Sequence, residues 1–352
     1  MVQTPSFHMS SQTDACEDNN NIVSIPYDVI QTNIITRLDG PTLAAAGCAS
    51  TELHVLVASE QLLWEKICHA TWPSTSDPRV SDVISSFRSG FRSFFSDSYP
   101  LIRHNVRRQS PDPVPTTSGL ISAVDIYYKG SPIFSKVVEM EVEKELFMCS
   151  PLRIDLLDAK EFVHPWIPEE EDDVLLKELE ENVTLSWILI DPERKRAVNL
   201  SSQHAVMAQR HWLTGEVQLK FAMVLGGGET GTEKEHVECS VVVTCTTGSG
   251  EAAGQVHARE VCMGMEDMEG RGLSGRDSLV ILLGAMVNGE RRGRRGINVA
   301  GEGRRRVVEF NERKEEWRTM KRRKDKVLDL VSVLGGVLVV LVFWLWLFGV
   351  FF

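Results

Sequence analysis

Apolar residues recur at helical spacing near the start of the chain. Ile30, Ile34 and Leu38 follow one another every four residues, which places them in one stripe along a helix. Pro26 suits the first turn of this helix, because its missing amide hydrogen would have no partner there. Turn-forming residues at 39–41 end the helix. Shorter helices are predicted at 42–47, 52–58 and 61–69, which together with the first predict a small all-α bundle.

After about residue 119 the pattern becomes that of strands. Val217, Leu219, Phe221 and Met223 alternate with polar or small residues, as in a strand with one buried face. Strands are predicted at 121–128, 134–138, 183–190, 196–200, 215–225, 236–246 and 256–263, with a closing helix at 277–288. Turn formers separate these runs, so we expect an antiparallel, sandwich-like β domain.

The segment 330–352 contains no charged residue. A helix rises about 1.5 Å per residue, so this run spans the roughly 30 Å hydrocarbon layer of a bilayer. A glycosylphosphatidylinositol signal also ends in an apolar tail, but it requires entry into the secretory pathway. The polar first 21 residues contain no apolar signal segment. We therefore expect a single transmembrane helix at 327–352.

These patterns predict an α+β chain of several parts. One connecting helix is expected at 80–95, and a linker rich in Pro, Ser and Thr at 110–118. The expected division is a disordered lead-in at 1–21, the helical bundle at 22–70, connecting helix and linker at 71–118, the β-rich domain at 119–290, a basic segment at 291–326 and the transmembrane tail at 327–352.

Charge is unevenly distributed along the chain. The net charge is −11, yet the segment 291–326 holds 15 Lys and Arg against six Asp and Glu. By the positive-inside rule, this segment and everything before it face the cytosol, with the endoplasmic reticulum or nuclear envelope favoured. Anionic lipid would attract the same residues. The alternative is a nuclear import signal or nucleic-acid patch in a nuclear or cytoplasmic protein. The adjoining apolar run favours the membrane flank, so no nucleic-acid partner is expected.

Familiar catalytic and metal-binding motifs do not occur in the sequence. It has no Gly-x-Ser-x-Gly and no His-Glu-x-x-His, and His204 and His211 have no nearby cysteine. The seven cysteines form no Cys-x-x-Cys pair, which fits reduced thiols in the cytosol. Cys239 and Cys245 read as small core residues. The sequence predicts no catalytic residue, no metal site and no cofactor.

Two further features bear on recognition. The acidic run 169–173 is expected to be a solvated loop, with contact to a basic target segment as the alternative. Three tryptophans could line a pocket but are more typical of a sheet core: Trp166, Trp187 and Trp212.

The order of motifs across 22–70 resembles the F-box. The chain has an Ile25-Pro26 start, the isoleucine-leucine stripe, a Leu38-Asp39 turn, a small-residue helix leading to Cys48, and a closing Leu63-Trp64. The resemblance is strongest to a plant subgroup whose F-box continues into Cys-His-x-Thr-Trp-Pro-Ser, matched here by 68–74. Thr51-Glu52 stands where basic residues are common in that family.

The resemblance implies a substrate receptor that is not itself an enzyme. Its F-box would bind a Skp-type adaptor and, through it, the cullin and RING subunits of a ubiquitin ligase. A β-rich domain, analogous to the phloem lectin-like domains of some plant F-box proteins, would recruit a protein target at a membrane. The alternative is a membrane-tethered F-box scaffold acting outside the ligase. The residues expected to face or support the adaptor are Ile25, Pro26, Ile30, Ile34, Leu38, Leu43 and Trp64.

Overall fold

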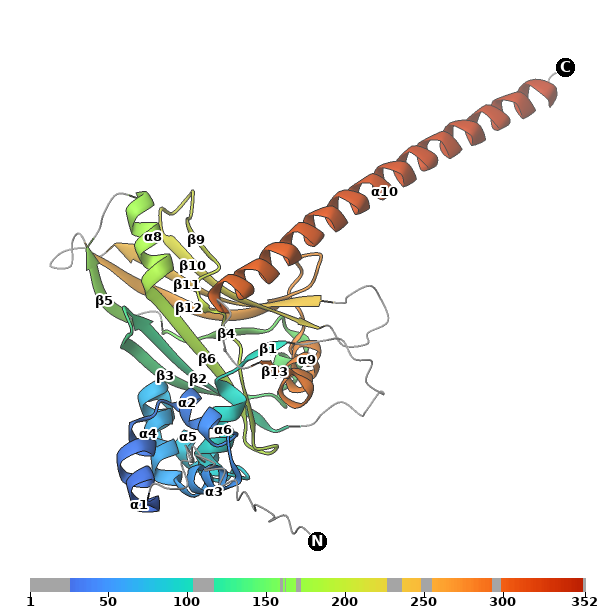
Figure 1. The fold of residues 1–352 in the computed structure, drawn as a ribbon. Coiled ribbons are helices and arrows are strands. Elements are labelled where there is room, and N and C mark those ends of the chain that lie inside the picture. Colours follow the sequence, from blue (N-terminus) through green and yellow to red (C-terminus); the bar gives the residue numbers. More distant parts are fainter. Residues whose placement is uncertain are drawn as a thin grey trace, which may run out of the picture. The chain divides into compact units, whose positions relative to one another are not determined.

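The fold was analysed in a computed structural model (Figure 1). The structure describes residues 26–103, 117–158, 161, 163–168, 172–226, 236–247, 255–292 and 299–350. The chain divides into two compact units, Met1–Leu63 and Trp64–Phe352. The expected lead-in at 1–21 and most of the linker at 110–118 lie outside the described residues.

The described part of the first unit is helical. Its elements are α1 (Tyr27–Val29), the π-helical turn η2 (Ile30–Ile34), the 3₁₀ turn η3 (Ile35–Arg37), α2 (Gly40–Ala46), α3 (Thr51–Ser59) and the start of α4 (Gln61–Thr71). Asp39 begins α2 by accepting a hydrogen bond from the Thr42 amide at 3.1 Å. Ser50 does the same for α3, accepting from the Leu53 amide at 3.2 Å. Such caps satisfy amides that have no partner within the helix.

The π-helical turn changes which isoleucines are buried. The Ile35 amide donates to the Ile30 carbonyl, so this turn closes over five residues instead of four. Ile30 and Ile35 are buried, whereas 41% of Ile34 is exposed and Leu38 is half-buried. The expected single stripe of Ile30, Ile34 and Leu38 is therefore wrong, because the extra residue in the turn rotates Ile34 off the buried face.

The helices that follow belong to the second unit. They are the end of α4, η4 (Pro73–Ser76), α5 (Pro78–Ser85) and α6 (Gly90–Ser98). The single helix expected at 80–95 is wrong, because the chain breaks between α5 and α6. Gly90 adopts a φ of +53°, which lies in the left-handed region that glycine accepts without strain.

Two antiparallel sheets form most of the second unit (Figure 1). The five-stranded sheet has the order β3-β2-β6-β7, with β8 beside β6; its strands are β2 (Gly119–Tyr128), β3 (Ser131–Glu141), β6 (Val183–Asp191), β7 (Arg196–Asn199) and β8 (Gln203–His204). The six-stranded sheet has the order β4-β12-β11-β10-β9, with β5 beside β12; its strands are β4 (Arg153–Asp155), β5 (Val163–Pro168), β9 (Met207–Arg210), β10 (Val217–Gly226), β11 (His236–Thr247) and β12 (Gln255–Glu266).

The remaining described elements are one pair of short strands and four helices, of which the last two along the chain are the longest. They are β1 (Leu101–Arg103), which pairs with β13 (Glu290–Arg292), and the helices α7 (Glu145–Cys149), α8 (Asp172–Asn182), α9 (Gly275–Asn288) and α10 (Val299–Val350). The acidic run 169–173 was expected to be a loop, but α8 begins within it at Asp172, and 169–171 lie outside the described residues.

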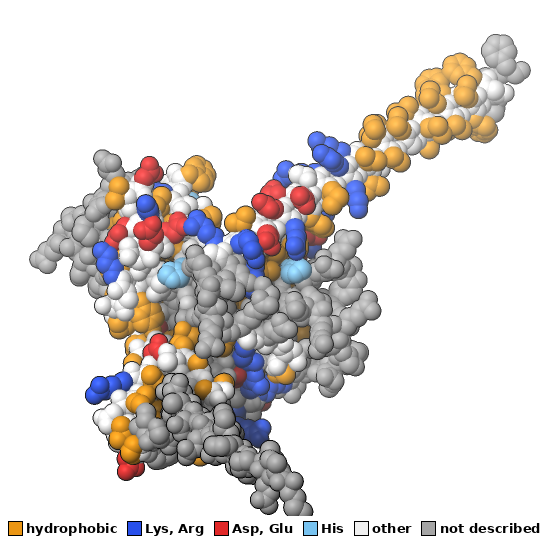
Figure 2. All heavy atoms as spheres, in the orientation of Figure 1, with side chains coloured by type: hydrophobic (Ala, Val, Ile, Leu, Met, Phe, Trp, Pro, Cys, Tyr) orange, Lys and Arg blue, Asp and Glu red, His pale blue; other side chains and the backbone are white. Residues whose placement is uncertain are grey.

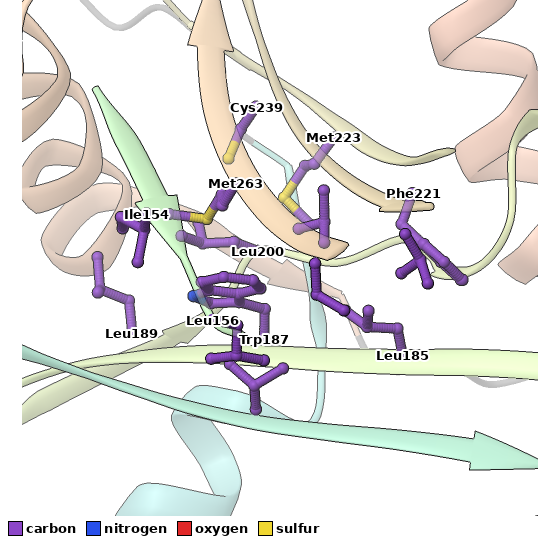
Figure 3. Packing of buried hydrophobic residues seen from close by; sticks show 14 of the residues in the cluster. Ile154, Leu156, Leu185, Trp187, Leu189, Leu200, Phe221, Met223, Cys239 and Met263 are labelled. Carbon is purple, nitrogen blue, oxygen red and sulfur yellow. The ribbon is translucent and has the colours of Figure 1, made fainter. Parts of the chain in front are cut away.

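Both sheets contribute to one buried cluster (Figure 3). Trp187 and Leu185 of β6 point toward Met223 of β10 and Met263 of β12. The Trp187 indole is fully buried and donates to the Ser122 hydroxyl at 3.1 Å, which satisfies its polar atom. The predicted α+β class and antiparallel β structure are confirmed, and each predicted strand overlaps an observed one.

The C-terminal helix is continuous across the expected boundary at 326/327. Its 52 residues, Val299–Val350, correspond to about 78 Å at 1.5 Å per residue. Figure 2 shows charged side chains along the half near the sheets and hydrophobic side chains along the far half. The far half is long and apolar enough to cross a membrane, by length and composition alone.

Candidate functional site

The exposed members of the expected adaptor site lie at the start of the first unit. Pro26 and Ile34 are exposed, and Leu38 is half-buried. Ile25 lies outside the described residues. Because Ile34 is apolar and turned outward by the π-helical turn, it is available for contact with another protein. The same turn keeps the neighbouring Ile35 in the interior.

The other expected site residues are interior supports. Ile30 and Leu43 are buried in the first unit. Trp64 belongs to the second unit, where it is 1% exposed and its ring centroid lies 5.3 Å from that of Phe95. These three side chains hold helices in place and do not present a surface to a partner.

Sequence reasoning missed three exposed aliphatic side chains in the first unit. Val29 is 40% exposed, Val55 is 65% exposed and Leu62 is 71% exposed. A signal for Val55 was present: in α3, four of the five residues 53–57 are apolar, which is more than one buried helix face can use. Together with Ile34, they give the described part of this unit an exposed apolar set.

Glu52, the acidic residue beside Thr51, has a local role at the start of a helix. Glu52 lies in the first turn of α3, directly after the Ser50 cap. A hydrogen bond from its own backbone amide, with further bonds from the Ser50 and Thr51 side chains, lowers the pKa of the Glu52 carboxyl. The negative charge also suits the helix N-terminus. This residue therefore contributes to the start of the helix.

The segment 68–74, which we call the clamp, is packed into the second unit. The Trp72 ring lies 5.7 Å from Phe94 and 5.5 Å from Phe95, measured between centroids. The Cys68 thiol is buried and donates to the Phe91 carbonyl, with 3.6 Å between the heavy atoms. The aromatic contacts join α4 and the following residues to α6.

Polar contacts fasten the clamp to the five-stranded sheet. The amide and hydroxyl of Ser74 donate to the Asp125 carboxylate of β2 at 2.8 and 2.6 Å. The Ser135 hydroxyl donates to the same carboxylate at 2.7 Å, and the Tyr127 hydroxyl donates to the Thr71 carbonyl. The plant-type Trp-Pro-Ser segment thus has a structural role that its sequence did not reveal.

Asp125 is the buried centre of these contacts. Burial raises the pKa of its carboxyl, and the hydrogen bonds from Ser74 and Ser135 act in the opposite direction. The contacts recorded for Asp125 are all hydrogen bonds that it accepts from serine groups of the neighbouring segments. We therefore interpret Asp125 as a structural acceptor.

One group of side chains on the six-stranded sheet has metal-ligand chemistry. The ligand atoms of Asp155, Glu260 and Cys262 lie within 4.8 Å of one another. The Arg153 guanidinium contacts the Asp155 and Glu260 carboxylates at 2.8 and 2.5 Å. Because this cation already pairs with both carboxylates, we interpret the group as an ion-pair cluster and assign no metal to it.

The structure also tests the expected core positions of the tryptophans and of two cysteines. Trp187 is in the core as expected, but Trp212 is 87% exposed, because it lies in the turn after β9 and not in a strand. The side chain of Trp166 lies outside the described ones. Cys239 and Cys245 are buried as expected, and burial raises the pKa of each thiol to about 12.

Known proteins from one plant are similar to almost the whole chain. F-box protein At2g27310 of Arabidopsis thaliana is 43% identical over 342 residues, covering 93% of this chain and 96% of that protein. F-box protein At3g44326 is 41% identical over 334 residues, covering 94% and 91%. Probable F-box protein At2g36090 is 43% identical over 335 residues, covering 92% and 94%. No family model and no solved structure matches the chain.

Proposed function

The chain belongs to the F-box protein family, and from this premise we propose that it is a substrate-receptor subunit of an SCF-type cullin–RING ubiquitin ligase. F-box proteins in general bind a Skp-type adaptor and act as receptors, not as enzymes. In this proposal the first unit binds the adaptor. The β-rich residues 119–290 bind a protein target. The chemistry of ubiquitin transfer belongs to other subunits, and this chain supplies proximity.

The observation that carries the adaptor proposal is the exposed apolar set of the first unit. Ile34, Val29, Val55 and Leu62 are each at least 40% exposed. Covering an aliphatic side chain contributes about 1.5–3 kcal/mol when burial is complete. These side chains are already partly buried, so covering them supplies part of the binding free energy, and other contacts of the first unit supply the rest. The buried Ile30, Leu43 and Trp64 would keep the helices in position.

Substitution of Ile34 tests this surface without disturbing the interior. We expect Ile34→Asp to weaken adaptor binding at least about tenfold, because a charge would replace about 1.4 kcal/mol or more of apolar contact. Thr36→Asp is the matched control, since Thr36 is exposed two residues away and gains the same charge. Binding is measured by titrating purified adaptor into the detergent-solubilised full chain. Unchanged affinity of the Ile34 variant would refute the assignment.

An Ile30→Asp/Ile34→Asp double variant should lose the adaptor completely, although part of that loss would come from unfolding around the buried Ile30. Pull-down of the tagged full chain from plant extract addresses the ligase itself. Stoichiometric adaptor and cullin support the receptor role. Adaptor without cullin would instead favour the alternative, a membrane-tethered F-box scaffold outside the ligase.

The membrane part of the proposal rests on α10. Its residues 327–350 would span the bilayer, and the basic residues just before them would keep the bulk of the chain on the cytosolic side. We favour the endoplasmic reticulum or nuclear envelope. Alkaline carbonate extraction should leave the full chain in the membrane pellet and release a chain ending at Lys326. Release of the full chain would refute the anchor.

A further inference from the structure

The first half of α10 is packed on the six-stranded sheet. Val307 is buried in a small cluster with Val206 and Ala222, separate from the main core. Ala222 follows Phe221 along β10, and successive strand residues point to opposite faces. Since Phe221 belongs to the main core, α10 covers the opposite face of this sheet. Phe310, one helical turn after Val307, is also buried.

Ion pairs continue the contact along the helix. The Lys314 ammonium lies 3.2 Å from the Glu266 carboxylate at the end of β12, although Lys314 is only 7% exposed. Lys321 lies 3.1 Å from Glu269, in the turn that follows β12. The order of these contacts shows that α10 runs from the middle of β10 toward the Glu266 end of the sheet.

The turn at this end of the sheet, residues 267–271, is well fixed. The Asp267 carboxylate accepts hydrogen bonds from the amides of Glu269 and Arg271 at 2.8 and 3.0 Å. Gly270 has a φ of +80°, and a Cβ at this position would lie 2.6 Å from the Arg318 guanidinium of α10. The turn is therefore held by its own hydrogen bonds, and Gly270 leaves the space that the Arg318 side chain occupies beside it.

The apolar part of α10 begins close to this turn. Val327 follows Lys321 by six residues, which is about 9 Å along the helix. The β9–β10 turn that carries Trp212 lies at the opposite end of the sheet, because β10 begins beside that turn and runs about 30 Å to its other end. The two ends of one sheet thus lie at very different distances from the apolar segment.

We propose that α10 is a docked stalk that turns the 267–271 turn toward an anionic membrane surface and holds the Trp212 turn away from it. This inference rests on the proposed membrane anchor. Exposed basic residues lie between the stalk contacts and the apolar segment, and they match anionic headgroups: Arg322, Arg323, Lys324 and Lys326. The acids at this end of the sheet, Glu266 and Glu269, are paired with Lys314 and Lys321, which reduces their repulsion of the headgroups.

Short-range fluorescence quenching in nanodiscs tests the orientation. A fluorescent amino acid replaces either Met268 or Trp212 in the full chain, which is reconstituted in discs of phosphatidylcholine and phosphatidylserine. A fraction of the lipid carries a nitroxide on its headgroup. We expect quenching at position 268 to exceed that at 212 several-fold. Equal quenching at both positions, in chain that co-elutes with the discs, would overturn the proposal.

Variants of α10 test whether docking sets this orientation. Phe310→Asp, at a buried position, should reduce quenching at 268 to the level at 212, whereas Val308→Asp on the exposed side should not. Lys314→Glu should act like Phe310→Asp, and adding Glu266→Lys should restore quenching, which separates loss of docking from loss of folding. Unchanged quenching in both docking variants would overturn the role of the stalk. Chain that fails to co-elute with discs would refute the membrane anchor itself.

Discussion

Replacing Asp125 by alanine should loosen the clamp on the five-stranded sheet. The Asp125 carboxylate accepts from the Ser74 amide and hydroxyl and from the Ser135 hydroxyl. The Ser74 amide is fixed by the backbone and buried, so it loses its acceptor without gaining water. The Ser135 hydroxyl is exposed and turns to solvent at little cost. The effect therefore comes mainly from Ser74.

The expected loss is about 2–3 kcal/mol. An orphaned buried amide costs about 1–3 kcal/mol, and the lost bond from the Ser74 hydroxyl to a charged group contributes about 1.5–3 kcal/mol. Removal of a buried carboxylate offsets part of this sum. Asp125→Asn is the matched control, because its amide group keeps an acceptor for the Ser74 amide and a donor for the Ser74 hydroxyl. We expect it to cost less than about 1 kcal/mol.

Hydrogen exchange measures this local loss in the full chain, for which a single two-state transition is not assured. Amides of β2 that exchange through opening of the clamp should do so roughly 30- to 140-fold faster in Asp125→Ala, since each 1.4 kcal/mol is a factor of ten. Equal exchange rates in the alanine and asparagine variants would refute the reasoning, because only alanine orphans the Ser74 amide.

Three further expectations concern pH, helix packing and thiol reactivity. Burial raises the pKa of the folded Asp125 carboxyl above its usual value of 3.8. The contribution of this carboxyl to stability is therefore present below pH 3.8 and is lost as pH rises through the folded pKa. The melting temperature of wild type should accordingly fall relative to that of Asp125→Asn over this pH range. On α9, the added methyl group of Gly284→Ala meets open space, so this variant should stabilise the fold by about 0.5–1 kcal/mol. Gly275→Ala instead places a Cβ against the Phe147 carbonyl, so it should lower the melting temperature. A thiol reagent at pH 8 should modify the exposed Cys48 and spare the buried Cys239, because burial raises the pKa of the Cys239 thiol to about 12. Peptide mapping identifies the modified cysteines, and rapid modification of Cys239 in the folded chain would contradict its burial.

The longer strands were predictable because apolar and polar residues alternate along them in the sequence. Val217, Leu219, Phe221 and Met223 alternate, and all four are buried in the structure. The strands β4 and β8, with three and two residues, are too short to show a period, so they were not predicted. The expected core position of Trp212 is wrong, because its residue type alone does not distinguish a tryptophan in a turn from one in a strand.

The helical region shows a different limit. A four-residue spacing predicted that Ile34 would share a face with Ile30, but one π-helical turn reassigns that face to Ile35. This local geometry depends on packing and has no spacing signature. The role of Ser74 was also invisible, because its acceptor Asp125 lies 51 residues away in the sequence. The exposed members of the proposed adaptor surface could be sought in the sequence only as apolar residues in excess of one helix face.

The continuity of α10 has a consequence for which targets the proposed receptor can meet. A flexible linker of 20 residues would let an attached domain wander over roughly 25 Å. A docked helix removes that freedom. In the proposed membrane-anchored receptor, the β-rich domain would therefore search for its target in two dimensions, at one height above the bilayer. Targets whose cytosolic segments lie at that height would be met at high effective concentration, while freely diffusing proteins would gain nothing from the tether.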